Sequence, residues 1–562
     1  MEDKVTVYIR NLGKKIEAKY NDILGSVLAR NNLLPLPCGG RGLCGQCIVK
    51  IKGEVSEPTG NELSRGLGGE LRLACQTRLL GDVEIELFHK PVLNVSHYSY
   101  NIMLRRIEPI YRVFDIASEN IPLMFPRELI VIEDNCLSQG NKIITLFDHP
   151  ISAINMREGK KHHILLVDIG TTKIAYQVVD ESGNVFFEKT ILNPLVRYGT
   201  DIITRLSKIM EQPGKIVEMR DILMKTIENI GRSYENIVLV AFAGNTVNQS
   251  IMLGLPVDKL AVKPYQPYFK GPFIGVTSNC IPFYAAPFIG GFVGGDAFSN
   301  MAAAEYIGLE KPYIIVDIGT NTEVIVGTGR DEDPIYATST PAGPAFEGHI
   351  ESGAGVGLPG ISKVRVREVR ENNVLFDYAV EGGVKPAGLL GSGIISLVAE
   401  LLRNGIIDKR GRITRGYNRI KGIKTLTIAG RDETVTGKPI IFTQLDIREL
   451  QKAIAAVKTS WQLLLREANI EVENLRWVVL TGTFGSSIDI DDALLLGLIP
   501  RIPRNKIIVA GNMVLSGLKT LVLDFEHEKN MRDLLKKARS IDLAETRDFT
   551  SVWIKNLEFD EH

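Results

Sequence analysis

The chain has 562 residues, several times the usual size of one domain, so we expect roughly two to four domains. Its 66 basic and 66 acidic side chains cancel, which excludes a global field for collecting nucleic acid or anionic membrane. Residues 1–10 lack the apolar stretch of a signal peptide, and the most apolar long segment, residues 281–295, is too short to span a bilayer. We therefore expect a cytoplasmic protein.

The six cysteines are unevenly distributed, with four of them in the first 75 residues. A disulfide framework would not produce this distribution. Cys136 and Cys280 stand apart from the others and from one another. We predict that both are buried small apolar residues.

The first domain begins with segments that alternate between polar and apolar residues. Residues 4–9 and 15–20 alternate around the turn at residues 11–13, as a β-hairpin requires. Apolar residues at helical spacing predict a helix over residues 22–31, and residues 83–87 form a last alternating strand. Residues 1–89 are therefore expected to form a small α+β domain.

Four cysteines in this domain predict a metal centre. Cys38, Cys44 and Cys47 occupy a short glycine-rich loop, which can approach a cluster closely, and Cys75 comes from a later element. Zinc ribbons prefer two Cys-x-x-Cys pairs, whereas this chain has one, so the pattern favours a 2Fe-2S cluster. The five residues between the first two cysteines resemble the adrenodoxin-type ferredoxins. That resemblance implies a β-grasp ferredoxin in which Cys38 and Cys44 hold one iron, and Cys47 and Cys75 the other.

The pattern changes after the first domain. Prolines punctuate short apolar runs up to about residue 161, and no cluster of catalytic side chains appears. The predicted organisation is a linker over residues 90–103 and a small mixed middle domain over residues 104–161.

An internal repeat marks the start of the large domain. Residues 164–173 and 313–322 each run an apolar strand into an Asp-x-Gly-Thr turn, with Asp168 and Asp317 at the same position. Such a turn can approach a phosphate, donate hydroxyl and N–H groups to it, and hold water on Mg²⁺ through the aspartate. Two facing hairpins of this kind would clamp a polyphosphate.

A third glycine turn follows the apolar strand at residues 477–481, as an adenosine-binding loop would. The order phosphate, phosphate, adenosine resembles the actin, hexokinase and sugar-kinase superfamily. This resemblance implies a two-lobed α/β ATPase domain, which we place at residues 162–545, followed by a C-terminal tail at residues 546–562.

A long helix is predicted within this domain over residues 446–470. Asp446 and Glu449 have the spacing of a capping box at its start. Apolar residues recur on one face, so we expect the helix to pack in the core.

The chain as a whole resembles the ATP-dependent reductive activators of corrinoid proteins, which join a 2Fe-2S ferredoxin, a linker, a middle domain and an actin-like ATPase domain. The resemblance rests on the phosphate hairpins and on further motifs at residues 193–201, 244–246, 294–296, 341–348 and 391–393. A relative of this family carries C-terminal 4Fe-4S motifs, but no cysteine follows Cys280. The ferredoxin-bearing branch is therefore the match. Thr322 departs from it, because a small residue is expected there.

The resemblance implies an activity. The activator returns one electron to a corrinoid protein whose cobalt has been oxidised from Co(I) to Co(II), and a methyltransferase system then resumes. It implies a 2Fe-2S cluster, ATP and Mg²⁺ as cofactors, and an upstream electron donor and a corrinoid protein as partners. Nucleic acid and membrane are not expected partners, and a homodimer is left open.

The resemblance also implies roles for individual residues. The aspartates of the repeat would position Mg²⁺ and water, Glu347 or Glu323 would orient water, and Ser339 is a candidate hydroxyl ligand to cobalt or a simple turn hydroxyl. Predicted phosphate contacts are Gly170, Thr171, Thr172, Lys173, Gly319, Thr320 and Asn321. Predicted nucleoside contacts are Gly391, Ser392, Gly482 and Gly485.

Two alternatives remain open from the sequence. A small-molecule kinase with an accessory redox domain would use Asp201 or Asp296 as a general base. A redox-sensing, nucleotide-dependent scaffold would deliver no electron to a corrinoid. The fused low-potential electron donor favours the activator.

Overall fold

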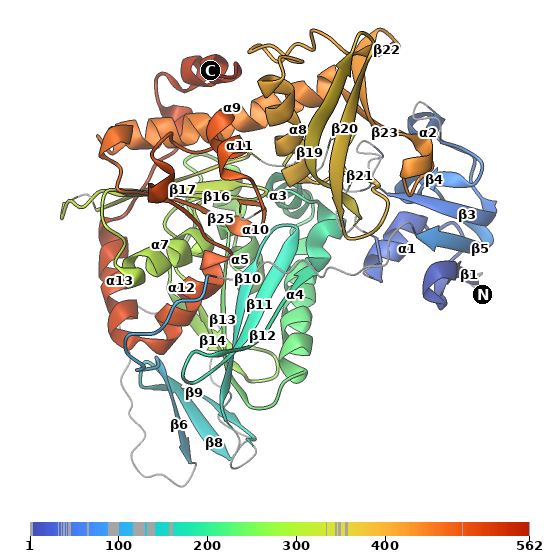
Figure 1. Ribbon diagram of the computed structural model, residues 1–562. Coiled ribbons are helices and arrows are strands. Elements are labelled where there is room, and N and C mark those ends of the chain that lie inside the picture. The colour runs from blue at the N-terminus through green and yellow to red at the C-terminus, as the bar shows by residue number, and fades with distance from the viewer. Residues whose placement is uncertain are drawn as a thin grey trace.

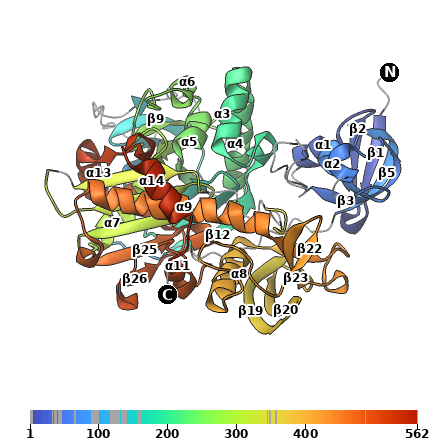
Figure 2. The ribbon, with the colours of Figure 1, turned by 90° about the horizontal axis from the view of Figure 1, so that it is seen from above.

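The computed structural model describes residues 4–31, 33–34, 36, 40, 42, 47–63, 67–87, 100–115, 130–131, 136, 141–156, 161–332, 334–342, 345–346, 350–354, 358–485 and 487–560. The N-terminal domain lies at one side of a larger body made of two sheets and their helices (Figures 1 and 2). Among these residues, no helix combines the length and the apolar character needed to cross a membrane.

The N-terminal domain is a five-stranded sheet with strand order β2-β1-β5-β3-β4. The first two strands form the predicted hairpin, and β1 pairs in parallel with β5, so the sheet is mixed as in a β-grasp domain. Buried apolar residues of the sheet and of α1 form its core. Its elements are β1 (Lys4–Ile9), β2 (Lys14–Lys19), α1 (Leu24–Arg30), β3 (Ile48–Val55), α2 (Gly60–Leu63), β4 (Leu71–Leu73), η2 (Ala74–Gln76) and β5 (Leu79–Leu87).

A small antiparallel sheet follows, built from β6 (Tyr111–Asp115), β8 (Lys142–Leu146) and β9 (His149–Ile154). It lies at the end of the body opposite to β19 and β20 (Figure 1). The short strand β7 (Ile130–Val131) pairs instead with β14 of the next sheet. Much of the predicted linker lies outside the described residues. Its last part packs on the body, because Ile102 is buried and Ser516 donates to the carbonyl of Tyr100.

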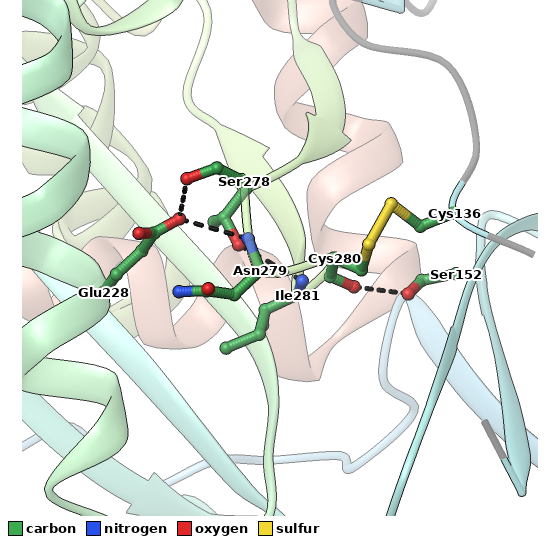
Figure 3. Close-up of a disulfide and its surroundings, with 8 residues drawn as sticks. Cys136, Ser152, Glu228, Ser278, Asn279, Cys280 and Ile281 are labelled. Carbon is green, nitrogen blue, oxygen red and sulfur yellow. Dashed lines mark hydrogen bonds between the residues drawn. A yellow bond between two sulfur atoms is a disulfide. The ribbon is translucent and has the colours of Figure 1, made fainter. Parts of the chain in front are cut away.

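The prediction that Cys136 and Cys280 are simply buried small apolar residues is wrong, since both are only half-buried. Their Cα atoms lie 5.5 Å apart and their sulfurs form a disulfide (Figure 3). The backbone of Cys136 forms an isolated β-bridge with that of Ser152 in β9. The Ser152 hydroxyl donates to the carbonyl of Cys280. The pairing depends on where the small sheet lies against the body, which spacing along the chain does not reveal.

The first lobe of the body is a seven-stranded sheet with order β12-β11-β10-β13-β15-β14-β7. Its outer face packs against α3, α4 and α5, and its inner face against α7. The elements are β10 (His163–Ile169), β11 (Lys173–Asp180), β12 (Val185–Leu192), η3 (Pro194–Tyr198), α3 (Ile202–Glu211), α4 (Lys215–Arg232), β13 (Ile237–Gly244), α5 (Thr246–Leu253), α6 (Asp258–Ala261), β14 (Phe273–Val276), β15 (Pro282–Ala285) and α7 (Gly295–Ile307).

The second lobe is a six-stranded sheet with order β26-β25-β16-β17-β18-β27, extended by two small three-stranded sheets. The helices α7 and α12 pack together between the two large sheets, where one apolar core joins both lobes. The elements are β16 (Tyr313–Ile318), β17 (Thr322–Gly327), β18 (Ile335–Thr340), β19 (Gly360–Arg370), β20 (Asn373–Glu381), β21 (Gly388–Leu389), α8 (Gly391–Arg403), β22 (Asn418–Ile420), β23 (Ile423–Ala429), η4 (Arg431–Glu433), β24 (Ile440–Thr443), α9 (Gln444–Glu467), η5 (Val472–Asn474), β25 (Trp477–Thr481), α10 (Gly482–Gly485), α11 (Ile490–Leu495), η6 (Arg504–Lys506), β26 (Ile507–Val509), α12 (Met513–Leu523), α13 (Phe525–Lys537), β27 (Arg539–Ser540), η7 (Leu543–Glu545) and α14 (Phe549–Asn556).

The long helix α9 packs in the core as predicted, but it begins at Gln444, directly after strand β24, and not at residue 446. Its N-cap is Thr443, whose hydroxyl accepts from the backbone N–H of Asp446, while the Asp446 carboxylate accepts from the backbone N–H of Thr443. The predicted box between Asp446 and Glu449 is therefore wrong. Glu449 instead pairs with Lys452 on the surface.

The predicted C-terminal tail packs along α9. Asn556 of α14 donates to Thr459 and Gln462 of that helix, and Lys458 pairs with Asp560. Phe559 is buried in the core of the second lobe. The described part of the tail is therefore an integral part of this lobe.

Candidate functional site

The two halves of the internal repeat face one another. Each forms an antiparallel hairpin, β10 with β11 and β16 with β17, and the turns line a common cavity of about 90 Å³. The hydroxyls of Thr172 and Thr320 lie 3.0 Å apart, so the turns touch directly. Of the predicted site residues, the structure places around this cavity Asp168, Gly170, Thr171, Thr172, Lys173, Asp317, Gly319, Thr320, Asn321 and Gly482.

Glycine is required in the first turn because the backbone closes on itself. A Cβ at Gly170 would lie 2.7 Å from the carbonyl oxygen of Lys173. Asn193 donates to the carbonyl of Gly170 over 2.7 Å, and Asn245 donates to the hydroxyl of Thr171 over 3.0 Å. Side chains from the neighbouring segments thus hold the turn in a fixed shape.

The buried Arg205 of α3 is a second support that sequence reasoning missed. Its guanidinium donates to the carbonyls of Thr171 and Gly199 and to the side chain of Asn248. No motif marks this residue, because its partners lie in three separate segments.

Four carboxylates gather at the cavity. Asp168, Asp296, Asp317 and Glu323 all line it, and Glu323 is only 6% exposed. Burial raises the pKa of Asp168 to about 7 and the pKa of Asp317 to about 6. Burial and the charges of Asp168 and Asp317 raise the pKa of Asp296 to about 8. The cavity therefore resists carrying several negative charges at once, and a bound cation would favour their ionised forms.

Two asparagines orient the aspartates of the repeat. Asn512, the N-cap of α12, donates to Asp168 over 2.6 Å, and Asn300 of α7 donates to Asp317 over 2.5 Å. Both asparagines were missed from the sequence. Asn512 lies 344 residues from its partner, so no local pattern could reveal the contact.

The third glycine turn meets the second aspartate. Gly482 follows β25 with φ +92°, and a Cβ there would lie 2.3 Å from Oδ1 of Asp317. Only glycine fits this position. Gly485 packs against Leu480 instead of lining the cavity.

Two other predicted residues, Gly391 and Ser392, do not line this cavity. Gly391 and Ser392 begin α8, and their motif is explained by packing, since a Cβ at Gly393 would lie 1.9 Å from the carbonyl oxygen of Ile361. Glu347 lies outside the described residues. A role for these residues with a nucleoside or water stays a prediction.

The cluster cysteines are described in part, since Cys38 and Cys44 lie outside the described residues. Cys47 and Cys75 are buried thiols on adjacent segments, joined by the N–H of Ala74 donating to the carbonyl of Cys47 over 2.9 Å. Gln76 donates to the carbonyl of Gly40, which ties the glycine-rich loop to the Cys75 segment. Two buried cysteine thiols on adjacent segments fit the ligand set of an iron–sulfur cluster.

Three family models match successive parts of the chain. The 2Fe-2S iron-sulfur cluster binding domain matches residues 7–80, the RACo middle region matches residues 164–307, and the C-terminal domain of RACo, the ASKHA domain, matches residues 311–562. The chain belongs to the RACo family. The predicted multidomain fold, the 2Fe-2S domain and the actin-like ATP-binding domain are thereby confirmed.

One relative of this RACo-family chain matches almost its full length, and another matches just over half of it. The corrinoid activation enzyme RamQ of Eubacterium limosum is 27% identical, with 98% of each chain covered. The [Co(II) methylated amine-specific corrinoid protein] reductase of Methanosarcina barkeri is 27% identical over 57% of this chain and 58% of its own. A solved structure of a reductive activator for corrinoid, iron-sulfur protein shares the fold, with a TM-score of 0.65, 24% identity, and 99% of this chain and 98% of its own covered.

A second, larger cavity of about 1070 Å³ opens between the lobes of this RACo-family body. Its walls come from α3, α9, the end of β18 and the C-terminal segment around α14, and they are mainly apolar. Ser339 lies in this wall, and Asn321 lines both cavities. Ser339, the predicted cobalt ligand, therefore lies close to the nucleotide cavity but lines the larger cleft.

Proposed function

We propose that this chain is an ATP-dependent reductive activase, which transfers one electron to the Co(II) of a corrinoid protein and restores Co(I). The observation that carries the proposal is the union in one chain of a ferredoxin domain and a two-hairpin ATP clamp. When bound by Cys38, Cys44, Cys47 and Cys75, the cluster supplies one electron at a time. An upstream electron donor replaces that electron.

ATP makes an uphill transfer possible. If the potential gap were about 0.3 V, one electron would cost roughly 7 kcal/mol, which one nucleotide cycle can offset. The γ-phosphoryl group of ATP need not be transferred to an acceptor molecule. It is sufficient that nucleotide favours one arrangement of the two lobes and that hydrolysis resets it.

We assign the clamp residues as follows. The phosphates are contacted by Thr171, Thr172, Lys173, Thr320 and Asn321, together with the backbone of Gly170 and Gly319. Gly482 receives the nucleoside at the same cavity, whereas Gly391, Ser392 and Gly485 lie outside its lining. Glu323 and Glu347 are the candidates for orienting the attacking water.

Mg²⁺ fits the oxygen-rich donor set around Asp168 and Asp317. Within the described part of the chain, no three carboxylate, imidazole or thiol groups converge as metal ligands. The ion would therefore be held by nucleotide phosphates and water, with the two aspartates orienting that water, as is usual for Mg²⁺.

The corrinoid protein docks, in this proposal, at the large cleft, where Ser339 offers its hydroxyl oxygen to cobalt. The apolar walls suit a macrocycle, and Ile203 and Met210 of α3 are 53% and 46% exposed at its edge. Both relatives named above act on corrinoid proteins or are named for their activation.

A kinase activity has less support. Both carboxylate oxygens of Asp201 are used in capping α3, one accepting from the N–H and the other from the hydroxyl of Thr204. Asp201 is therefore a structural cap. Asp296 lies among the clamp carboxylates.

The proposal is tested anaerobically. The reduced protein is mixed with candidate Co(II) corrinoid proteins, with and without MgATP, and Co(I) is followed by absorbance. Co(I) that forms only with MgATP supports the activase and identifies its partner. Absence of Co(I) with every candidate, together with ATP consumption stimulated by a small metabolite, would favour a kinase.

A further inference from the structure

A row of polar side chains crosses the second large sheet. Asp317 of β16 is directly opposite Glu323 of β17, and Glu323 is directly opposite Ser339 of β18. Directly paired residues of antiparallel strands point to the same face of a sheet. The row therefore leads from the nucleotide cavity towards the interlobe cleft.

The middle of this row forms the wall between the two cavities. Glu323 lines the nucleotide cavity, and Ser339 lines the cleft. The Ser339 hydroxyl donates to Oε1 of Glu323 over 3.1 Å. This hydrogen bond thus joins a residue of one cavity to a residue of the other.

The neighbours of Glu323 leave its orientation dependent on this bond. Burial raises the pKa of Glu323 well above its usual value, and the charges of Asp296 and Asp317 add to this effect because they repel its ionised form. Ser339 supplies the side-chain hydrogen bond that favours the ionised form. Loss of that bond would free the carboxyl group to turn away from its two acidic neighbours.

We propose that Ser339 is a positioning residue for the nucleotide site and that its bond to Glu323 couples the cleft to the clamp. From the cleft, the hydroxyl holds the Glu323 carboxyl towards the bound nucleotide. An electron-pair acceptor that binds the hydroxyl oxygen from the cleft makes its O–H a stronger donor to Glu323. Nucleotide and cleft occupant therefore strengthen each other's binding, as linkage requires. Only the identity of the occupant rests on the function proposed above.

The test measures nucleotide binding without any corrinoid. The affinity of the full-length protein, with its cluster, for MgADP is determined anaerobically by calorimetry in Ser339→Ala, Ser339→Thr and Thr338→Val. Thr338 is a matched control, because its hydroxyl donates to the carbonyl of Ile541 and it precedes Ser339 on the same strand. We expect roughly five- to tenfold weaker binding in Ser339→Ala, the size of one lost hydrogen bond, with affinity restored in Ser339→Thr and unchanged in Thr338→Val.

Unchanged affinity in Ser339→Ala, or an equal loss in Thr338→Val, would overturn the coupling. A double-mutant cycle with Glu323→Gln provides a second readout. Removing Ser339 should have little further effect in the Glu323→Gln background, whereas additive effects would contradict a shared path. Because no cobalt is present, failure here leaves the activase proposal standing, and failure of the Co(I) assay leaves the coupling standing.

Discussion

At the residue scale, the site is a mixture of positions that motifs mark and positions that only the fold brings in. Asp168 and Asp317 were predicted because they repeat at the same place in two hairpins. Their partners Asn512 and Asn300 were not, since a side-chain contact across the fold leaves no trace in local spacing. Glycine turns are predictable to the extent that backbone approach excludes every other residue.

Gly482 gives the sharpest test, because its backbone lies so close to Asp317 that a side chain would not fit. Gly482→Ala would push a methyl group into Asp317 at a backbone conformation that favours glycine, so the clamp should lose at least tenfold in MgADP affinity, about 1.4 kcal/mol. Gly214→Ala is the control, because a Cβ there meets no atom within 4 Å. Calorimetry on both variants checks this, and equal affinities would refute the role of the turn.

The pH dependence of stability tests the buried carboxylates. Because the folded-state pKa of Asp168 is raised from 3.8 to about 7, the folded protein binds this proton more tightly than the unfolded chain does. The stability that this carboxyl contributes is therefore present at low pH and lost as the pH rises towards about 7.

Asp168→Asn should accordingly make the free energy of unfolding of the nucleotide-free protein fall less steeply with pH. Urea denaturation over this range measures it, with the exposed Asp377→Asn as control. An unchanged slope in Asp168→Asn would show that its carboxyl does not titrate as the structure indicates.

At the element scale, the hairpins and the core helix were predictable, but their exact limits were not always so. Both Thr443 with Asp446 and Asp446 with Glu449 have capping-box spacing. Strand β24 runs directly into α9 without a loop, so no turn residues mark the true start. The capping box that forms is Thr443 with Asp446, because Thr443 is the last residue of the strand that leads into the helix.

The disulfide links two elements that the sequence keeps far apart. One end, Cys136, lies in a segment that pairs with β9, and the other, Cys280, lies in the connection between β14 and β15. The two cysteines are 144 residues apart in the sequence. Oxidised protein should be more stable than reduced protein by about 2 to 4 kcal/mol. Urea denaturation with and without dithiothreitol measures the difference.

The double variant Cys136→Ala with Cys280→Ala is the control for this measurement. It should show no difference between oxidising and reducing buffers, while keeping both cluster thiols Cys47 and Cys75 unchanged. A reductant effect of the same size in the double variant would assign the stability change to the cluster instead.

At the scale of the whole molecule, the order of domains was predictable from the cysteine loop and the repeat, but their contacts were not. Helix α1, which packs on the η2 segment carrying Cys75, also contacts η3 of the first lobe. Asn193, the N-cap of η3, reaches the first phosphate turn. The ferredoxin domain thus rests on a segment that also supports the clamp, a relation that no motif encodes.

The most direct test of the account is a single-turnover measurement on the full-length protein. The cluster is reduced by one electron, excess reductant is removed, and a Co(II) corrinoid protein is added before MgATP. The account predicts that MgATP triggers cluster oxidation and Co(I) formation together, in equal amounts. Co(I) formed at the same rate without MgATP, or cluster oxidation without Co(I), would contradict it.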